Sequence, residues 1–410
     1  MTEQGKKTTS FNSIDQVYQY IFSIPMFATA GAGAARWGLD GIQKLCAILG
    51  NPHKNLAAIH IAGTNGKGTL AHYLNEVYTR SGYRTGVYSS PHLQELRERW
   101  VINKQMMSDE ALLDLFSKYG EQISELSPTF FELTTAIAFR YFADQKVDIA
   151  IIETGLGGRL DATNIIDPQL SIITSIGFDH QQILGNSLAK IAGEKAGIIK
   201  PQRPVLIGKL PQEAIEVVKK ISFDRNAPLY ECDSEKVNGT GLSTENVNSE
   251  LAIKTVSILS DQFPVNSGDA ESGVKIAGTT LPGRFEKLHH NYHWYFDGAH
   301  NIDAVNNLKE KITSIDDISY ATVVLSVMSD KASEDFLSLF SEFRKILYHP
   351  LETQRAASFA DIESRLLNVE LFPQDNHTRT GLLNSLKSEL VIFTGSFYFY
   401  PYVKDWMKSF

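Results

Sequence analysis

Short apolar runs rich in β-branched residues alternate along this chain with helix-length amphipathic segments, and this alternation restricts the fold more than any other feature. The segments TLAHYLNEVYTRSG and FELTTAIAFRYFADQ have the pattern of helices. The apolar runs around them are AAIHIAG (57–63), TGVYSS (85–90), VDIAIIETG (147–155), LSIITSIG (170–177) and RPVLIG (203–208). Strands that alternate with helices predict an α/β fold with a mainly parallel sheet.

The length of the chain indicates two domains, because 410 residues exceed what one hydrophobic core usually supports. Residues from about 233 to 280 are poorer in core residues and are expected to form loops around one helix near 248–262. A second α/β series follows LPGRFEKLHHN, with YHWYFDGAHN, YATVVLSVMSDK, FRKILYHP and LVIFTGSF. We therefore predict an N-terminal domain over residues 1–288 and a smaller, C-terminal α/β domain over 289–410.

Charge, cysteine content and the absence of long apolar runs argue against several classes of protein. Acidic residues outnumber basic ones by 47 to 39, which argues against a nucleic-acid partner. Cys46 and Cys232 lie far apart in sequence, which argues against a disulfide framework and fits a reducing cytoplasm. The start, MTEQGKKTTSFNS, has no apolar signal segment, and no apolar run is long enough to span a bilayer. We expect a cytoplasmic protein without membrane partners.

The segment HIAGTNGKGTLAHYL, residues 60–74, approximates a phosphate-binding loop between a strand and a helix. Gly66 and Lys67 fit the pattern G-x-x-x-x-G-K-[ST], but Ile61 replaces the first glycine, and the hydroxyl comes one residue late, at Thr69. Glycines allow backbone N–H groups to converge on an anion at a helix N-terminus, where a lysine can reach the terminal phosphates. The alternative is a glycine turn with a surface lysine.

Polar side chains follow the other predicted strands where ligands bind in open α/β sheets, beyond the carboxyl ends. Ser90 follows the second run, Glu153 the third and His180 the fourth. Hydroxyl and carboxylate oxygens are ligands for Mg²⁺, which also keeps phosphate oxygens. Each residue alone also has a structural explanation, as a turn cap, a surface charge or a helix-initiating hydrogen bonder. Their joint position beside a phosphate loop favours a nucleotide site.

Several long motifs carry a resemblance to a known family over nearly the whole length. They are LGNPHKNLAAIHIAGTNGKGT, SSPHLQELRERWVIN, TFFELTTAIAF, ETGLGGRLDATN, ITSIGFDHQQILGNSLAKIAGEKAGIIK, LPGRFE, FDGAHN and FTGS. The chain resembles the folylpolyglutamate synthases and dihydrofolate synthases, a branch of the Mur-ligase superfamily of ATP-dependent amide-forming enzymes. The resemblance implies an N-terminal P-loop ATPase domain and a C-terminal Rossmann-like domain, with the active site in the cleft between them.

The resemblance also implies roles for single residues. Ser90 and Glu153 match ligands of one Mg²⁺, and His180 matches a ligand of a second. Lys195 in GEKAGIIK matches a lysine that is carbamylated in the family; without the match it would be a solvated helix charge. Lys67, His180 and Lys195 are the expected catalytic residues. Those expected to hold ATP are Gly63, Thr64, Asn65, Gly66, Lys67, Gly68, Thr69, Asn248, Arg284, Asp297 and His300.

The residues that bind the folate substrate are the hardest to identify from the sequence. Arg97, Glu132, Arg159 and Asp161 are candidates for substrate contacts, and for each a helix-surface or turn role is equally open. The segment ATAGAGAARWGLD (28–40) is similar to a loop that closes over the substrate in the family, and LPGRF marks a hinge.

The sequence departs from the family pattern at three positions: Thr69 replaces serine, Glu245 replaces glutamine, and Leu281 replaces an aromatic residue. These departures concern nucleotide contacts and leave the chemistry in place.

The implied activity joins L-glutamate to dihydropteroate, to the glutamate of a folate, or to both. ATP would convert the acid into an acyl phosphate, which the glutamate amine attacks, so positioning and charge neutralisation suffice. The second candidate function is that of a different Mur-type ligase, which adds an amino acid to a cell-wall nucleotide precursor. A P-loop switch without bond formation is disfavoured by Glu153 and His180, and a dinucleotide-dependent dehydrogenase by the lack of G-x-G-x-x-G after the first strand. We expect a monomer.

Overall fold

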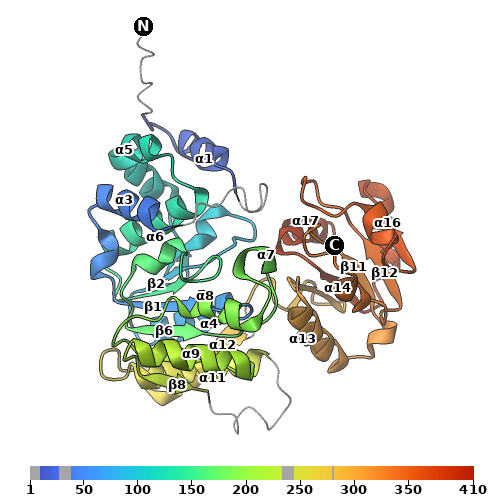
Figure 1. Ribbon diagram of the computed structural model, residues 1–410. Helices are drawn as coiled ribbons and strands as arrows, with labels where there is room; N and C mark the ends of the chain where they lie inside the picture. The colour runs from blue at the N-terminus through green and yellow to red at the C-terminus, as the bar shows by residue number, and fades with distance from the viewer. Residues whose placement is uncertain (1–9, 27–37, 233–243, 279–280) are drawn as a thin grey trace. The chain divides into compact units, whose positions relative to one another are not determined.

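The computed structural model describes residues 10–26, 38–232, 244–278 and 281–410, which form two compact units (Figure 1). The second unit holds Gly177–Asp179 and the described residues from Gly278 to Phe410, and the first unit holds nearly all the others. The boundary predicted at 288–289 falls inside the second unit, because β9 (Glu286–Lys287) pairs antiparallel with β10 (Trp294–Asp297). Most of the loop predicted at 28–40 lies outside the described residues.

The first unit is built on an eight-stranded sheet in the order β4-β3-β2-β5-β1-β6-β7-β8. Only β3 and β4 pair antiparallel to their neighbours, so the expected mainly parallel sheet is confirmed. The five strands predicted from sequence are β1, β2, β5, β6 and β7. The bounds are β1 Ala58–Ala62, β2 Thr85–Tyr88, β3 Trp100–Ile102, β4 Gln105–Met106, β5 Ile149–Glu153, β6 Leu170–Ile173, β7 Val205–Ile207 and β8 Leu229–Glu231.

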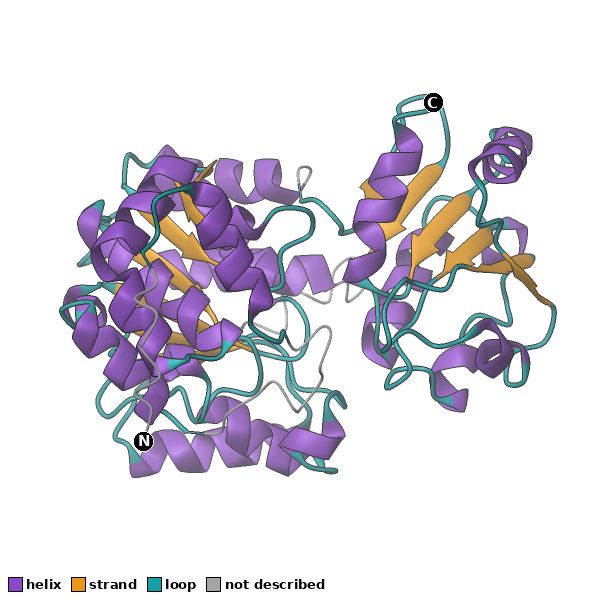
Figure 2. Cartoon of the chain, turned by 90° about the horizontal axis from the view of Figure 1, so that it is seen from above, coloured by secondary structure: helices purple, strands orange, loops and turns teal. Residues whose placement is uncertain are grey.

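Helices cover both faces of this sheet (Figure 2). The α-helices are α1 Ile14–Ser23, α3 Asp40–Ile48, α4 Lys67–Arg80, α5 Asp109–Leu126, α6 Phe130–Asp144, α7 Gln181–Leu184, α8 Leu188–Ala196, α9 Gln212–Asp224, α11 Thr244–Ile258 and α12 Ser267–Gly278. Short 3-10 helices are η2 Pro52–Asn55, η3 Leu96–Arg99 and η4 Ala162–Ile165. The predicted helices are α4 and α6, and α11 is the helix expected near 248–262.

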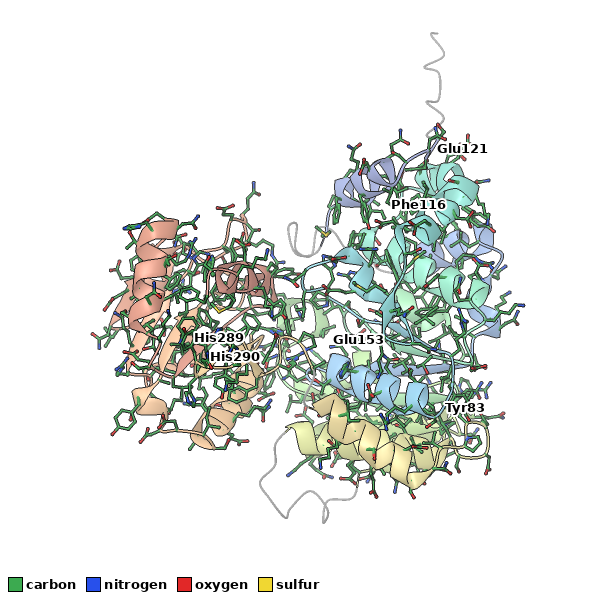
Figure 3. The ribbon with its side chains drawn as sticks, turned by 180° about the vertical axis from the view of Figure 1, so that it is seen from behind. Tyr83, Phe116, Glu121, Glu153, His289 and His290 are labelled. Atoms are coloured by element: carbon green, nitrogen blue, oxygen red, sulfur yellow. The ribbon has the colours of Figure 1, made fainter. Side chains whose placement is uncertain are left out.

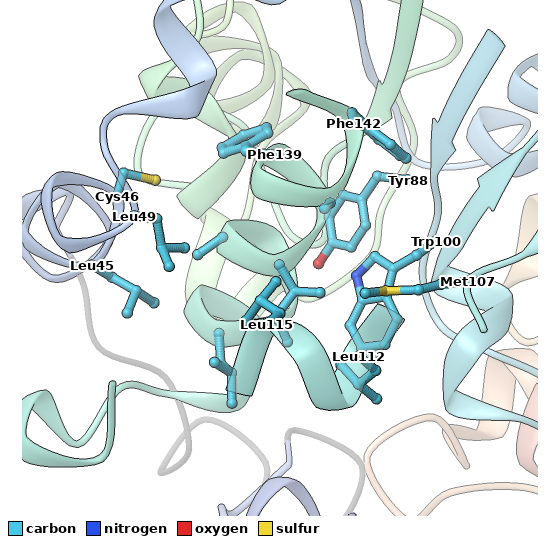
Figure 4. Close-up of a cluster of buried hydrophobic side chains, with 14 of the residues drawn as sticks. Leu45, Cys46, Leu49, Tyr88, Trp100, Met107, Leu112, Leu115, Phe139 and Phe142 are labelled. Atoms are coloured by element: carbon cyan, nitrogen blue, oxygen red, sulfur yellow. The ribbon is translucent and has the colours of Figure 1, made fainter. Parts of the chain in front are cut away.

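Strand β5 shows why both faces must be covered. Its Ala150 and Ile152 belong to the core that α3, α5 and α6 cover, whereas Ile149 and Ile151 belong to the core under α4 and α11. Because side chains alternate along a strand, an uninterrupted apolar run needs an apolar layer on each side. Figure 4 shows the first of these cores, in which Trp100 and Tyr88 are fully buried.

The second unit is a six-stranded sheet in the order β13-β12-β11-β14-β10-β9, parallel except for β9. Its further strands are β11 Thr322–Leu325, β12 Lys345–Tyr348, β13 Val369–Leu371 and β14 Val391–Thr394. Its helices are α13 Ile302–Thr313, η5 Ile318–Tyr320, α14 Glu334–Ser338, α15 Phe359–Glu363, α16 Asn376–Ser385, η6 Phe397–Phe399 and α17 Tyr400–Met407. The predicted second α/β series is therefore present.

Candidate active site

The glycine loop forms the expected connection between a buried strand and a helix. Strand β1 ends at Ala62, and α4 begins at Lys67 after Gly66, which has the left-handed φ of +88°. A side chain is rarely tolerated in that conformation, so the position requires glycine. The N–H groups that open a helix have no partner within it and, with the helix dipole, attract an anion. The loop therefore has the geometry of a phosphate cradle.

Lys67 folds back over this loop. Its Nζ donates to the carbonyl oxygen of Gly63 at 3.0 Å and to that of Thr64 at 3.4 Å. Lys195 reaches the same place from α8, where its Nζ donates to the oxygen of Gly63 at 2.9 Å, although only 4% of the residue is exposed. Two side chains expected to be catalytic thus meet at one carbonyl oxygen.

Two hydroxyl residues that the sequence analysis did not select hold the loop from the side. Thr174 and Ser175 follow β6, and both hydroxyls donate to the carbonyl oxygen of Asn65, at 2.6 Å and 3.0 Å. The N–H of Asn65 donates to the Ser175 hydroxyl at 2.9 Å, and the N–H of Thr64 donates to the Ser175 carbonyl at 2.9 Å. Sequence analysis placed Thr174 and Ser175 inside the apolar run 170–177, whereas the strand ends before them, at Ile173.

The expected ligands of one metal ion come together. The Glu153 carboxylate, at the end of β5, accepts a hydrogen bond from the N–H of Ser90 at 3.1 Å. A Cβ at Gly68, in the first turn of α4, would lie 3.6 Å from a Glu153 carboxylate oxygen, so the carboxylate lies beside the helix end (Figure 3). A carboxylate and a serine at a phosphate cradle are suitable donors for Mg²⁺.

His180 comes after β6, which pairs with β1, and precedes α7, with a left-handed φ of +48°. Among the residues that the structure describes, no group of three His, Cys, Asp or Glu side chains could hold a metal ion. A metal site here would therefore rely on mixed donors, including a hydroxyl and phosphate oxygens.

Asn248 of α11 packs against the glycine loop. A Cβ at Gly66 would lie 2.8 Å from Asn248 Nδ2, which is buried without a hydrogen-bond partner in the described part of the chain. A buried amide without a partner is costly, and a bound nucleotide would supply one.

Each of the four candidate substrate residues has a protein partner in this structure. Arg97 pairs with Glu95 at 2.8 Å and with Asp109 at 3.5 Å, and Arg159 pairs with Glu194 at 2.8 Å. Glu132 completes the capping box that starts α6.

Asp161 accepts bonds from the N–H groups of Gly155, Leu156 and Thr163 and from the Thr163 hydroxyl. Burial raises the pKa of Asp161, and these donors oppose the shift. Its carboxylate thus shapes the glycine-rich loop after Glu153.

The second unit holds three further predicted nucleotide residues: Arg284 before β9, Asp297 at the end of β10 and His300 just after it. Arg284 lies over the Phe397 ring, 4.4 Å from its centroid. Asp297 accepts from the N–H of Phe285 at 2.9 Å, and burial raises its pKa although Lys311 and Arg284 oppose the shift.

Burial lowers the pKa of His300, whose Nδ1 donates to Gly298 O at 2.8 Å. Its Nε2 lies 3.8 Å from Asp179, which also pairs with Lys331 and accepts from Asn301. The sequence analysis named neither Asp179 nor Lys331.

Comparison with known proteins identifies the family of this chain. The family model of the Mur ligase middle domain matches residues 61–280, more than half of the chain. The chain is a Mur ligase family member. Within the family it is similar to the dihydrofolate synthase/folylpolyglutamate synthase of Bacillus subtilis, at 31% identity over 90% of this chain and 95% of that one.

Two solved structures match this Mur ligase over its full fold. Escherichia coli FolC in complex with DHPP and ADP has a TM-score of 0.85 and 26% identity, and covers 98% of this chain and 99% of its own. A bifunctional folylpolyglutamate synthase/dihydrofolate synthase with Mn, AMPPNP and L-glutamate bound has a TM-score of 0.82 and 27% identity, over 97% and 99% of the chains. The predicted family and fold class are confirmed. No described helix of this Mur ligase is long and apolar enough to cross a membrane.

Proposed function

We propose that this chain is an ATP-dependent ligase that joins L-glutamate to dihydropteroate and to the glutamate of a tetrahydrofolate. The observation that carries the proposal is the position of the Glu153 carboxylate beside Gly68 at the start of α4. The backbone N–H of Ser90 donates a hydrogen bond to the same carboxylate. This arrangement can hold a divalent cation against a phosphate. Relatives that match nearly the whole chain carry both activities in their names.

The chemistry requires an activated acid, because a carboxylate does not form an amide with an amine in water. Transfer of the γ-phosphoryl of ATP to the carboxylate gives an acyl phosphate, and attack by the glutamate amine then releases phosphate. Such transfer depends on positioning and on neutralising charge. The α4 N-terminus and Lys67 contribute positive charge, and Gly63 to Thr69 form the cradle.

A divalent cation fits the donors at this site. Glu153 and Ser90 would hold one ion and His180 a second, and the ions would neutralise charge on the phosphates. Asn248, Arg284, Asp297 and His300 are the further nucleotide contacts that we propose.

Carbamylation of Lys195 fits the structure for an electrostatic reason. Lys67 and Lys195 place two ammonium groups on the Gly63 carbonyl, and like charges so close repel each other. A carbamate would make Lys195 an anion beside Lys67. Removal of dissolved CO₂ should lower activity, bicarbonate should restore it, and isotope-labelled bicarbonate should give a carbamate NMR signal that Lys195→Arg lacks. A wild-type protein without this signal would contradict the proposal.

The test of the function is phosphate release from ATP, Mg²⁺ and L-glutamate, measured in parallel with dihydropteroate and with tetrahydrofolate. Turnover with both acids is expected. Turnover with only one would restrict the enzyme to that activity. Failure with both, together with turnover of a cell-wall nucleotide acid, would refute the folate assignment while leaving the Mur ligase chemistry intact.

A further inference from the structure

The phosphate loop does not hold its shape by itself. Within the described residues, Asn65 forms three hydrogen bonds with Thr174 and Ser175, and Thr64 forms a fourth with Ser175. These partners lie about 110 positions further along the chain. The nearby Gly63 must be glycine, because a Cβ there would lie 1.9 Å from the Thr174 hydroxyl.

The anchored carbonyl determines where the next N–H points. A peptide unit is planar and trans, so the carbonyl oxygen of Asn65 and the N–H of Gly66 point in opposite directions. Both hydroxyls draw that oxygen toward β6. The N–H of Gly66 therefore points away from β6, in the turn that leads into α4.

Ser175 has the larger share of this anchoring. Its hydroxyl accepts from the Asn65 N–H at 2.9 Å and donates to the Asn65 carbonyl at 3.0 Å, so it fixes the peptide units on both sides of Asn65. The Thr174 hydroxyl fixes only one of them, at 2.6 Å. Since the Asn65 N–H is used in this contact, phosphate binding depends on the N–H groups that follow it.

We infer that Ser175, assisted by Thr174, is a positioning residue for nucleotide binding, which orients the Gly66 N–H and the first turn of α4 toward the phosphates. The inference rests on the proposed function, because it requires that the loop binds ATP. It predicts that loss of the Ser175 hydroxyl affects nucleotide affinity and leaves the binding of the other substrates intact.

The experiment compares ADP affinity and Michaelis constants in four variants. Ser175→Ala removes both hydrogen bonds between the Ser175 hydroxyl and Asn65. Thr174→Val removes the hydrogen bond from the Thr174 hydroxyl to Asn65 with little change of side-chain shape. Ser175→Thr keeps a hydroxyl at this half-buried position. Ser171→Ala is the matched control, since the Ser171 hydroxyl is buried in β6, the strand that leads to Thr174 and Ser175, but donates to Ile198 O at 3.0 Å.

Ser175→Ala should raise the dissociation constant of ADP and the KM of ATP about tenfold, since two hydrogen bonds that orient the loop are lost. Thr174→Val should raise them less. The KM of L-glutamate should stay within about twofold, Ser175→Thr should restore ADP affinity, and Ser171→Ala should bind ADP as the wild type does.

The outcomes separate the inference from the function on which it rests. If the wild type does not bind ADP, both the proposed function and the inference fail. If the wild type binds ADP and Ser175→Ala binds it equally well, only the inference fails. An equal loss of affinity in Ser171→Ala and Ser175→Ala would also overturn it, because the effect would then follow from general loosening of β6. Circular dichroism and thermal unfolding of each variant verify that it is folded.

Discussion

The carboxylate of Glu153 and the backbone N–H of Ser90 are 3.1 Å apart, so a hydrogen bond joins the ends of β5 and β2. These strands are neighbours in the sheet, with Tyr88 opposite Ile152. The two residues are separated by 63 positions in the chain, and the parallel sheet brings them to one edge. This edge is where we propose that a divalent cation binds.

Replacement of Glu153 by Gln should therefore change the metal dependence of the reaction. We expect kcat/KM to fall by about 100-fold or more and the Mg²⁺ concentration for half-maximal rate to rise, because a neutral amide binds the cation poorly. Glu76→Gln is the control, since Glu76 is also only 4% exposed but pairs with Lys104. An unchanged Mg²⁺ requirement in Glu153→Gln would contradict the proposed site.

Replacement of Asn248 by Ala should weaken nucleotide binding more than it weakens the fold. The buried Nδ2 has no protein partner among the described residues, so its removal should cost at most about 1 kcal/mol of the free energy of unfolding. The dissociation constant of ADP should rise about tenfold. The comparison is Asn75→Ala, which removes the bond from the Thr79 hydroxyl and should leave ADP affinity unchanged. Equal ADP binding in both variants would show that Asn248 does not contact the nucleotide.

Replacement of Asp161 by Asn distinguishes a loop-shaping role from a substrate contact. Gly155 and Leu156 donate to one carboxylate oxygen of Asp161 and Thr163 donates to the other. An amide has only one accepting oxygen, so one of these two sets of donors would lose its partner, and we expect a loss of about 2–4 kcal/mol in stability. The value of kcat should fall, because this loop follows Glu153. A variant of normal stability with a raised KM for the folate acid would instead identify Asp161 as a substrate ligand.

Acid should destabilise the second unit through His349. This side chain is packed among Phe399, Phe372 and Trp406, and burial, with Arg379 nearby, lowers its pKa to about 4. The unfolded chain binds a proton near pH 6.5, whereas the folded chain does so only near pH 4. Stability therefore falls as the pH drops from about 6.5 to about 4, by up to about 1.4 kcal/mol per pH unit.

His349→Phe should reduce the difference in the free energy of unfolding between pH 7 and pH 5 by on the order of 2 kcal/mol. Urea denaturation at the two pH values measures it, and the substitution of the exposed His377 by Asn serves as the control. If the free energy of unfolding changes equally between pH 7 and pH 5 in the wild type and in His349→Phe, His349 is not the origin of the acid sensitivity.

The parts of the site that depend on local sequence could be predicted. The apolar run 57–63, followed by glycines and a helical pattern, located β1, the loop and α4. Residues at strand ends were also identifiable, because parallel strands place their carboxyl ends at one edge.

Parts that depend on distant contacts could not be predicted. The partners of Asn65 are set by the pairing of β1 with β6, in which Ile61 lies opposite Ile172. A single sequence gives the order of strands along the chain but not their neighbours in the sheet. Nor does it show that Arg97 and Arg159, which have the chemistry to bind a glutamate carboxylate, already have carboxylate partners in the folded chain.

The central position of β1 has a consequence for synthesis of the protein. Its two neighbours in the sheet, β5 and β6, begin at residues 149 and 170, so β1 leaves the ribosome long before either can pair with it. At translation rates of roughly 5–20 residues per second, this strand, buried along its whole length in the native sheet, waits on the order of ten seconds for its partners. A nascent chain in this interval has an apolar strand with two open edges, and the loop after it has not yet gained its hydrogen bonds with Thr174 and Ser175. Chaperones that bind exposed apolar segments would act during this interval.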